Sequence, residues 1–268
     1  MESSSRPLAP RPLALVTGAS GGIGAALARE LARHGHDLVL ASRGLAAMQA
    51  LADELRAMGG EATVIQTDLA RPGAAAALAH DVLSRGLAVD VLVNNAGLGA
   101  AGRFDRCDPG RIGEMLQVNI VALTELTRLL LPGMIARRRG RIMLVASVAG
   151  FQPGPHMAVY FASKAYVLSL GEALACELRG TGVTVTTLCP GATATRFFEV
   201  AGAEKSIMAR RLRRMMPAED VARIGYRALA AGRPVAITGA MNRLVALAGR
   251  YAPRRITLPV TDRLMSED

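Results

Sequence analysis

Three residues near the middle of the chain have the types and spacing of a proton-transfer site. Tyr160 and Lys164 are four residues apart, so in a helix the phenol and the ammonium lie on one face. Ser147 follows the apolar run of residues 141–146, which predicts that its hydroxyl projects from the end of a buried strand. A hydroxyl, a phenol and an ammonium that converge at a strand end can donate and accept protons. The pattern therefore predicts acid–base catalysis.

A glycine-rich turn near the N-terminus predicts an anion-binding site. Leu13–Thr17 is a short apolar run, residues 18–24 are GASGGIG, and residues 25–34 have helical composition. Glycines let the backbone approach a phosphate closely, and free N–H groups at a helix N-terminus point towards it. The spacing TGxxxGxG differs from GxGxxG and indicates a particular branch of the dinucleotide-binding proteins.

The end of the second predicted strand, residues 38–41, indicates which dinucleotide binds. In such folds the residue at this position meets the adenosine ribose, and an acid there selects a free 2′-hydroxyl. The chain has Ser42 and Arg43 instead, and a hydroxyl with a guanidinium suits a 2′-phosphate. We therefore expect NADP(H) as the preferred cofactor and NAD(H) as the less favoured one. The alternative interpretation is a surface arginine that merely follows a strand.

The remaining elements alternate between strands and helices. We expect further strands at 62–66, 89–93, 142–146, 183–188 and 234–238, and helices at 45–58, 72–85 (with Pro72 in its first turn), 112–137 and 157–179. This order predicts an α/β fold, a Rossmann-like doubly wound parallel sheet of about seven strands with helices on both faces. Ligands of that architecture bind beyond the carboxyl ends of the strands. The residues expected there are Gly18, Arg43, Asp68, Asn95, Ser147 and Gly191.

Asparagines mark two further positions. Residues 94–97 are NNAG and follow a predicted strand directly, so small residues there allow a flat ligand to approach while the asparagines can tie neighbouring strands together. Asn119 lies inside the long predicted helix. A buried asparagine costs stability unless its amide is hydrogen-bonded, so we expect a functional role for it.

Together these motifs resemble those of the short-chain dehydrogenase/reductase family. The resemblance covers about residues 13–237 and includes TGASGGIG, NNAG, YxxxK and the Pro-Gly turn, in the family's order. Ser147 lies 13 residues before Tyr160, and Asn119 lies 22 residues after Gly97, as the family leads one to expect. The resemblance implies an enzyme that interconverts a carbonyl and an alcohol with a nicotinamide cofactor.

The resemblance also implies roles for individual residues. Tyr160 would be the general acid in reduction and the base in oxidation, with its pKa lowered by Lys164 and by the oxidised nicotinamide. Ser147 would donate a hydrogen bond to the substrate oxygen, and Asn119 would hold a water that links Lys164 to solvent. Thr193 stands where the family often has Ile or Val. The implied cofactor contacts are Gly18, Ser20, Gly21, Gly22, Ile23, Gly24, Ser42, Arg43, Asp68, Leu69, Asn95, Ala96, Gly97, Tyr160, Lys164, Pro190, Gly191, Thr193 and Thr195.

The segment between the serine and the tyrosine is expected to line the substrate pocket. After the Pro-Gly turn, residues 194–216 are expected to form a mobile lid. The expected substrate contacts are Ser147, Phe151, His156, Met157, Tyr160 and Phe197. This lining is mostly apolar, which favours a ketone or aldehyde on a hydrophobic body. Since a fold does not fix a substrate, an inactive NADP(H)-binding sensor or scaffold is the alternative function, disfavoured by the intact catalytic residues.

Both ends of the chain lie outside the core expected at residues 13–240. Residues 1–12 contain three prolines and predict a flexible arm without a signal peptide. Residues 241–268 mix leucines and valines with five arginines. Three interpretations of this extension stay open: a subunit contact, a cover over the pocket, or an amphipathic anchor at a membrane surface. Packing against the protein itself or against a second subunit is the favoured one, and we expect a homodimer or homotetramer.

Composition limits the remaining functions. The net charge of +10 invites a nucleic-acid partner, but basic runs such as residues 137–139 have no interleaved aromatics and match no DNA-binding motif. We therefore expect no nucleic-acid binding. Cys107, Cys176 and Cys189 have neither CxxC nor metal-ligand spacing, which predicts a reducing, cytoplasmic compartment and no metal site. No uninterrupted apolar run approaches the length of a membrane-spanning helix.

Overall fold

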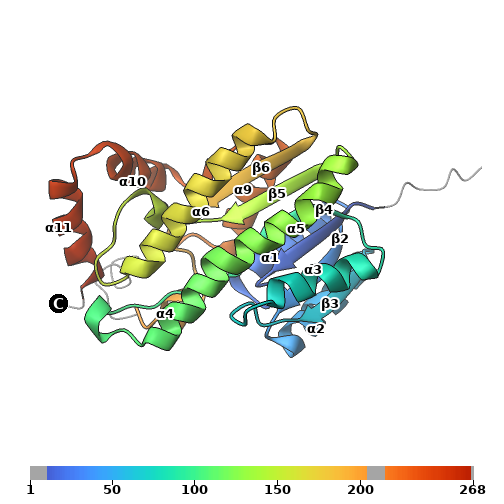
Figure 1. The fold of residues 1–268 in the computed structure, drawn as a ribbon, viewed down its shortest axis with the longest axis horizontal. Coiled ribbons are helices and arrows are strands. Elements are labelled where there is room, and N and C mark those ends of the chain that lie inside the picture. Colours follow the sequence, from blue (N-terminus) through green and yellow to red (C-terminus); the bar gives the residue numbers. More distant parts are fainter. Residues whose placement is uncertain (1–10, 204–214, 267–268) are drawn as a thin grey trace, which may run out of the picture.

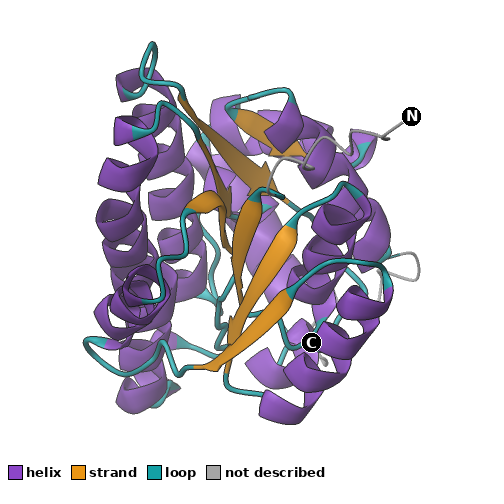
Figure 2. Ribbon diagram, turned by 90° about the vertical axis from the view of Figure 1, so that its right-hand side faces the viewer, coloured by secondary structure: helices purple, strands orange, loops and turns teal. Residues whose placement is uncertain are grey.

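Seven parallel strands form one sheet, with helices on both of its faces (Figure 2). In this computed structural model, which describes residues 11–203 and 215–266, the strand order is β3-β2-β1-β4-β5-β6-β7. The strands are β1 (Leu13–Thr17), β2 (Asp37–Ser42), β3 (Ala62–Gln66), β4 (Val89–Asn94), β5 (Gly140–Val145), β6 (Val183–Cys189) and β7 (Val235–Ile237). This order and the parallel pairing of all neighbours confirm the doubly wound, Rossmann-like sheet that the sequence predicts.

The helices lie in two layers that sandwich the sheet. Their bounds are α1 (Gly22–Arg33), α2 (Leu45–Ala57), α3 (Ala74–Ser84), α4 (Pro109–Leu116), α5 (Leu123–Ala136), α6 (Ala158–Glu177), α7 (Phe197–Ala201), α9 (Ala218–Ala230), α10 (Ala240–Tyr251) and α11 (Arg254–Met265), with short 3₁₀ turns η1 (Phe104–Arg106) and η3 (Val148–Phe151). Helices α1, α2 and α9 pack on one face of the sheet, and α3, α5 and α6 pack on the other. Neighbouring strand residues point to opposite layers, so Val16 packs with the first group and Leu15 with the second. Because both faces are covered, the central strands are continuously apolar.

Helix α3 begins later than the sequence predicts. The expectation placed Pro72 in the first turn, but the helix starts at Ala74. Gly73 precedes it with φ 79°, a left-handed conformation that a helix cannot include. Pro72 therefore lies before the helix, and this detail of the prediction is wrong.

The long helix predicted at 112–137 is continuous from Pro109 to Ala136 but changes its winding. Asp108 caps its start, accepting a hydrogen bond from the Gly110 N–H. Between α4 and α5, residues Gln117–Ala122 form a π-helical stretch, η2. Among the described residues, this is the one helix long and apolar enough to cross a membrane by length and composition, although no uninterrupted apolar run indicates it. The buried side of this long helix packs together with α3 and α6 on one face of the sheet.

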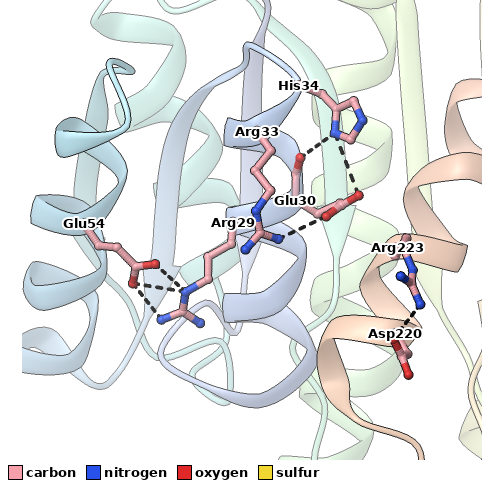
Figure 3. A network of polar contacts seen from close by, with 7 residues as sticks. All are labelled: Arg29, Glu30, Arg33, His34, Glu54, Asp220 and Arg223. Carbon is pink, nitrogen blue, oxygen red and sulfur yellow. Dashed lines mark hydrogen bonds and ion pairs between the residues drawn. The ribbon is translucent and has the colours of Figure 1, made fainter.

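A polar contact joins the first helix to its neighbour α2 (Figure 3). Arg29 of α1 forms a bidentate pair with Glu54 of α2, with nitrogen–oxygen distances of 2.8 Å. This hydrogen bond lowers the pKa of the Glu54 carboxyl. Further along α1, the ring of His34 stacks on Tyr226 of α9 with 3.9 Å between centroids. Since the Arg29–Glu54 pair is partly exposed, it contributes about 0.5 kcal/mol and mainly fixes the orientation of α1.

The C-terminal extension forms two helices. Helices α10 and α11 lie together at one end of the molecule, shown in red at the left of Figure 1. Most of the predicted N-terminal arm, residues 1–10, and the centre of the predicted lid, residues 204–214, lie outside the described residues. The described start of the lid segment contains the short helix α7.

Candidate active site

A cavity of about 840 Å³ opens at the carboxyl ends of the strands. Residues that follow six strands line it, which is the position expected for a ligand of a doubly wound sheet. Those residues include Gly18 after β1, Arg43 after β2, Thr67 after β3, Asn95 after β4 and Ser147 after β5. The volume is in the range of sites for cofactors and small molecules.

The glycine-rich turn forms one end of this cavity. Gly18 and Gly22 have φ angles of 66° and 54°, which residues with a Cβ rarely adopt. Gly18, Ser20, Gly21, Gly22 and Ile23 all line the cavity. Because α1 begins at the turn, its free N–H groups are available to an anion there.

Gly24 departs from its predicted place. It is not among the cavity residues, and a Cβ at this position would lie 2.3 Å from the Gly18 carbonyl oxygen and 2.5 Å from Asn95 Nδ2. The absence of a side chain therefore lets α1 pack tightly on the turn. The structure gives Gly24 a packing role, and its expected pyrophosphate contact stays a prediction.

Thr17 and Asn95 tie the ends of β1 and β4 together. The Thr17 hydroxyl donates to the Val93 carbonyl and accepts from the N–H groups of Asn95 and Ala96, at 3.3, 3.0 and 3.0 Å. Asn95 Nδ2 in turn donates to the Thr17 carbonyl at 2.9 Å. The prediction that asparagine joins neighbouring strands at NNAG is confirmed for this residue.

Hydroxyl and guanidinium groups gather at the end of β2. The hydroxyls of Ser20 and Ser42 are 2.9 Å apart, and Arg43 is exposed at the cavity wall. Asp68 and Leu69 line the same end. This part of the cavity thus offers several hydrogen-bond donors and one fixed positive charge, which are suited to a phosphate.

Ser147, Tyr160 and Lys164 converge on the cavity from β5 and α6, as their spacing predicts. Ser147 lies between β5 and η3, where its hydroxyl accepts from the Ala149 N–H at 3.1 Å and donates to the Pro190 carbonyl at 3.4 Å. Lys164 Nζ lies 5.8 Å from the centre of the Tyr160 ring and donates to the Val145 carbonyl at 2.9 Å. Predicted neighbours at i and i+4 are thus side by side.

Burial shifts the pKa values of both groups. Loss of solvation raises the pKa of the Tyr160 phenol to about 12, against a lowering contribution from the Ser147 hydrogen bond. The same effect lowers the pKa of the Lys164 ammonium to about 8. In the protein alone, burial therefore outweighs the lowering of the tyrosine pKa that the sequence predicts. The phenol keeps its proton at neutral pH.

Asn119 lies in the π-helical stretch η2 and is buried with its amide satisfied. Its Oδ1 accepts from the Leu98 N–H at 2.8 Å, and its Nδ2 donates to the Leu98 carbonyl and the Ser163 hydroxyl, both at 2.9 Å. A Cβ placed on Gly97 would lie 3.3 Å from Lys164 Nζ and 3.5 Å from Asn119 Oδ1. The lysine and the asparagine therefore border the same small space, although Asn119 itself does not line the cavity.

The substrate end of the cavity differs in part from the prediction. Met157 and Phe197 line it as expected, together with Gln152. Phe151 does not, because its ring is buried in the core beneath α10. His156 does not either, because its Nε2 lies 3.1 Å from Asp262 Oδ1 on α11. These two expected substrate contacts are corrected to a core residue and a contact to the C-terminal helix.

The C-terminal helices complete the cavity wall. The lining residues that they contribute are Met241, Asn242, Val245, Thr261, Leu264 and Met265. Of the three interpretations of the extension, a cover over the pocket therefore fits the side of α10 and α11 that faces the cavity. None of these residues was singled out from the sequence, since their only signal was leucine and methionine in a segment of unassigned position.

The remaining predicted cofactor contacts also lie at the cavity wall. Ala96, Gly97, Pro190, Gly191, Thr193 and Thr195 all line the cavity. Thr193 is buried, and its hydroxyl donates to the Gly191 carbonyl at 3.0 Å. This hydrogen bond satisfies the hydroxyl of a threonine at a position where the family often has Ile or Val. Among the described residues, no group of three His, Cys, Asp or Glu side chains is placed to hold a metal ion.

Comparison with known proteins finds a matching family model and relatives of similar sequence. The family model of the short chain dehydrogenases matches residues 12–206. Ketoacyl reductase HetN of Nostoc is 38% identical over 177 residues, which cover 66% of this chain and 62% of that protein, so this chain matches less than two thirds of that relative's length.

Two solved structures are similar to this protein over most of its length. A short-chain dehydrogenase from Sphingobium yanoikuyae, in complex with NADPH, is 34% identical with a TM-score of 0.80 and covers 89% of this chain and 92% of its own. A dehydrogenase/reductase from Burkholderia phymatum, in complex with NAD, is 28% identical with a TM-score of 0.82 and covers 96% and 97%.

Proposed function

The chain belongs to the short-chain dehydrogenase family and is an oxidoreductase, and from this premise we propose that it interconverts a carbonyl and an alcohol on a hydrophobic small molecule with NADP(H). One observation carries the proposal. Ser147, Tyr160 and Lys164 lie together at the wall of the same cavity as the glycine-rich turn, with Lys164 Nζ 5.8 Å from the centre of the Tyr160 ring.

Tyr160 is the proposed general acid in reduction and base in oxidation. Its phenol keeps its proton at neutral pH, so it can donate to the oxygen of a carbonyl that is being reduced. Ser147 donates a hydrogen bond to the same oxygen, where negative charge develops. Lys164 and Asn119, which border one space, connect the phenol with solvent for proton exchange. The nicotinamide, when bound, supplies or accepts the hydride.

The preference for NADP(H) over NAD(H) rests on the end of β2. The two serine hydroxyls and the Arg43 guanidinium meet there, and an acid that would bind a free 2′-hydroxyl is absent from positions 42 and 43. NADPH is bound by the Sphingobium relative and NAD by the Burkholderia relative, so likeness alone favours neither.

A hydrophobic substrate is supported by the opposite end of the cavity. Met157, Phe197, Phe198 and Met265 lie together there in one apolar cluster. The Nostoc relative is named for ketoacyl reduction, which is the same reaction class on an aliphatic body. We therefore infer an aliphatic or polycyclic ketone rather than a sugar.

The setting of the enzyme is also a proposal. The three cysteines are free, which supports a reducing, cytoplasmic compartment. Val121 and Leu129 on the long helix are exposed, and they support contact with a second subunit in a homodimer or homotetramer.

The test is a panel of aliphatic, aromatic, steroid and 3-oxoacyl carbonyls, with NADPH oxidation as the readout. We expect Tyr160→Phe to lower turnover at least about 100-fold, because a positioned acid contributes that much, while the dissociation constant of NADPH stays within about twofold. The matched control is Tyr166→Phe, on the same helix, whose hydroxyl is 2.9 Å from that of Thr124 outside the cavity. NADPH oxidation by Tyr160→Phe at the wild-type rate would sink the assigned role.

A further inference from the structure

The helix α10 presents its large apolar side chains outward. Leu244, Leu247 and Tyr251 expose 61%, 54% and 74% of their surface. The residues that α10 buries against the protein are small, Ala246 and Gly249. A helix that packs on a protein core normally has the opposite arrangement.

Helix α11 repeats this reversal. Ile256 and Val260, four residues apart, are more than half exposed. Thr257 and Thr261 are buried instead, and the hydroxyl of Thr257 has no hydrogen-bond partner within the described part of the chain. Between residues 256 and 261, large apolar side chains therefore face solvent while threonines face the protein, and the end of α11 buries Met265.

These residues lie on two consecutive helices at the same end of the molecule (Figure 1). We call Leu244, Leu247, Tyr251, Ile256 and Val260 the C-terminal apolar face. Spacings of three and four residues put the α10 members on one side of that helix, and the spacing of four puts Ile256 and Val260 on one side of α11. An exposed apolar surface of this kind marks an interaction site.

The charges around the face point to an anionic partner. Residues 240–266 contain five arginines and a single acid, Asp262, which is bonded to His156. Arg243 lies on the flank of α10 between its exposed apolar side and its buried side, whereas Arg250 on the same flank pairs with Glu172 of α6 at 3.5 Å. Two acids, Glu267 and Asp268, follow outside the described residues. A second copy of the chain would bring its own arginines against the arginines of the first copy. Anionic lipid headgroups would instead neutralise these arginines.

We propose that the C-terminal apolar face docks on the surface of an anionic lipid bilayer. Leucine, isoleucine and valine enter the boundary between headgroups and acyl chains, the arginines meet the phosphates, and the tyrosine spans the polar and apolar layers. Aliphatic side chains flanked by basic ones at helical spacing are the pattern of helices that lie in this plane.

Docking also gives the cavity access to lipophilic substrates, a step that rests on the proposed function. Met241 and Val245 of α10 both line the cavity and are exposed to solvent. They connect the cavity to the outer side of the helix by apolar surface. A carbonyl compound dissolved in the bilayer therefore reaches Tyr160 without crossing water.

The test is co-sedimentation of the full-length protein with vesicles. We expect binding to phosphatidylcholine vesicles that contain phosphatidylglycerol, weak binding to pure phosphatidylcholine, and a decrease with salt. The triple variant Leu244→Ser, Leu247→Ser, Tyr251→Ser should lower the partition coefficient on the order of 100-fold, because three large side chains lose their apolar burial. Arg243→Gln with Arg255→Gln should lower it on the order of tenfold on the anionic vesicles only.

A matched control replaces exposed apolar residues elsewhere. Met58→Ser with Leu83→Ser, at the C-terminal ends of α2 and α3, should bind vesicles like the wild type. None of the substituted residues lines the cavity, so NADPH binding and reduction of a water-soluble ketone should persist in every variant and report on the proposed function separately.

Two results would overturn the proposal. One is a wild-type protein that stays in the supernatant with both vesicle types, or a triple variant that binds as well as the wild type. The other is self-association of the wild type that the triple variant loses without any vesicle binding, which would assign the face to a second copy of the chain.

Discussion

Burial acts in opposite directions on the two titratable groups at the centre of the site. It raises the pKa of the Tyr160 phenol to about 12 and lowers that of the Lys164 ammonium to about 8. The phenol is therefore ready to give a proton at neutral pH, and the ammonium is close to losing one. This combination suits a site that moves a proton between a substrate oxygen and solvent.

The lysine makes stability depend on pH. Its pKa falls from 10.5 unfolded to about 8 folded, so between these values the unfolded chain binds more protons and stability rises with pH. We expect the free energy of unfolding of the wild type, relative to Lys164→Met, to rise by roughly 3 kcal/mol from pH 8 to pH 10.5. Urea denaturation at several pH values measures it. Because Lys164 also lowers the pKa of the Cys189 thiol, both proteins carry Cys189→Ala, and a difference independent of pH would contradict the buried ammonium.

Arg43 is the residue on which the cofactor preference depends. Its exposed guanidinium at the cavity wall can pair with a 2′-phosphate but has no partner on a 2′-hydroxyl. Arg43→Ala should weaken NADPH binding about tenfold to 100-fold and leave NADH binding within about twofold, as measured by fluorescence titration. Arg71→Ala, close by but outside the cavity lining, serves as the control. An unchanged preference in Arg43→Ala would show that another group binds the phosphate.

The glycine-rich turn and the start of α1 work as one packed unit. Gly24 has no room for a side chain, since a Cβ would meet the Gly18 carbonyl oxygen at 2.3 Å. Gly24→Ala should lower the free energy of unfolding by about 1–3 kcal/mol, because α1 must move away from the turn. Gly21→Ala is the matched control, since nothing lies within 4 Å of its added Cβ and its φ of 176° is extended. Equal stability of the two variants in urea would mean that the helix start is loosely packed.

The π-helical stretch η2 positions one predicted site residue within the long helix. An extra residue per turn at Gln117–Ala122 changes the direction of the side chains there, and Asn119 lies within it. Its amide reaches Leu98 after β4 and Ser163 on α6. One asparagine thus joins three elements around Lys164.

At the scale of the whole molecule, the C-terminus completes a pocket begun by the middle of the chain. Met265 of α11 is buried against Phe161 and Phe197 in the apolar cluster. Met265→Ala should raise the KM of a hydrophobic ketone about tenfold to 100-fold, since about 1.5–3 kcal/mol of apolar contact is lost, with NADPH affinity unchanged. Ile256→Ala, exposed on the same helix, is the control for the reaction in vesicle-free buffer. A KM equal to that of the wild type would place the substrate away from α11.

Sequence alone determined the sheet and the positions of the site residues. Strand Ala62–Gln66 begins and ends where the sequence predicts, because its consecutive β-branched residues 63–65 favour a strand. Tyr160, Lys164 and Ser147 converge because helical spacing and a strand end are local rules that a sequence displays directly. Parallel strands then bring Gly18, Arg43 and Asn95 to the same edge without further information.

Only the tertiary structure decided what depends on contacts distant in sequence. Phe151 and His156 left the cavity because α10 and α11 fold back over them, more than 80 residues further along the chain. Gly24 has a packing role because it touches Asn95, which no local pattern reveals. The outward apolar face of the C-terminal helices arose in the same way, since which side of a helix is covered depends on what it packs against.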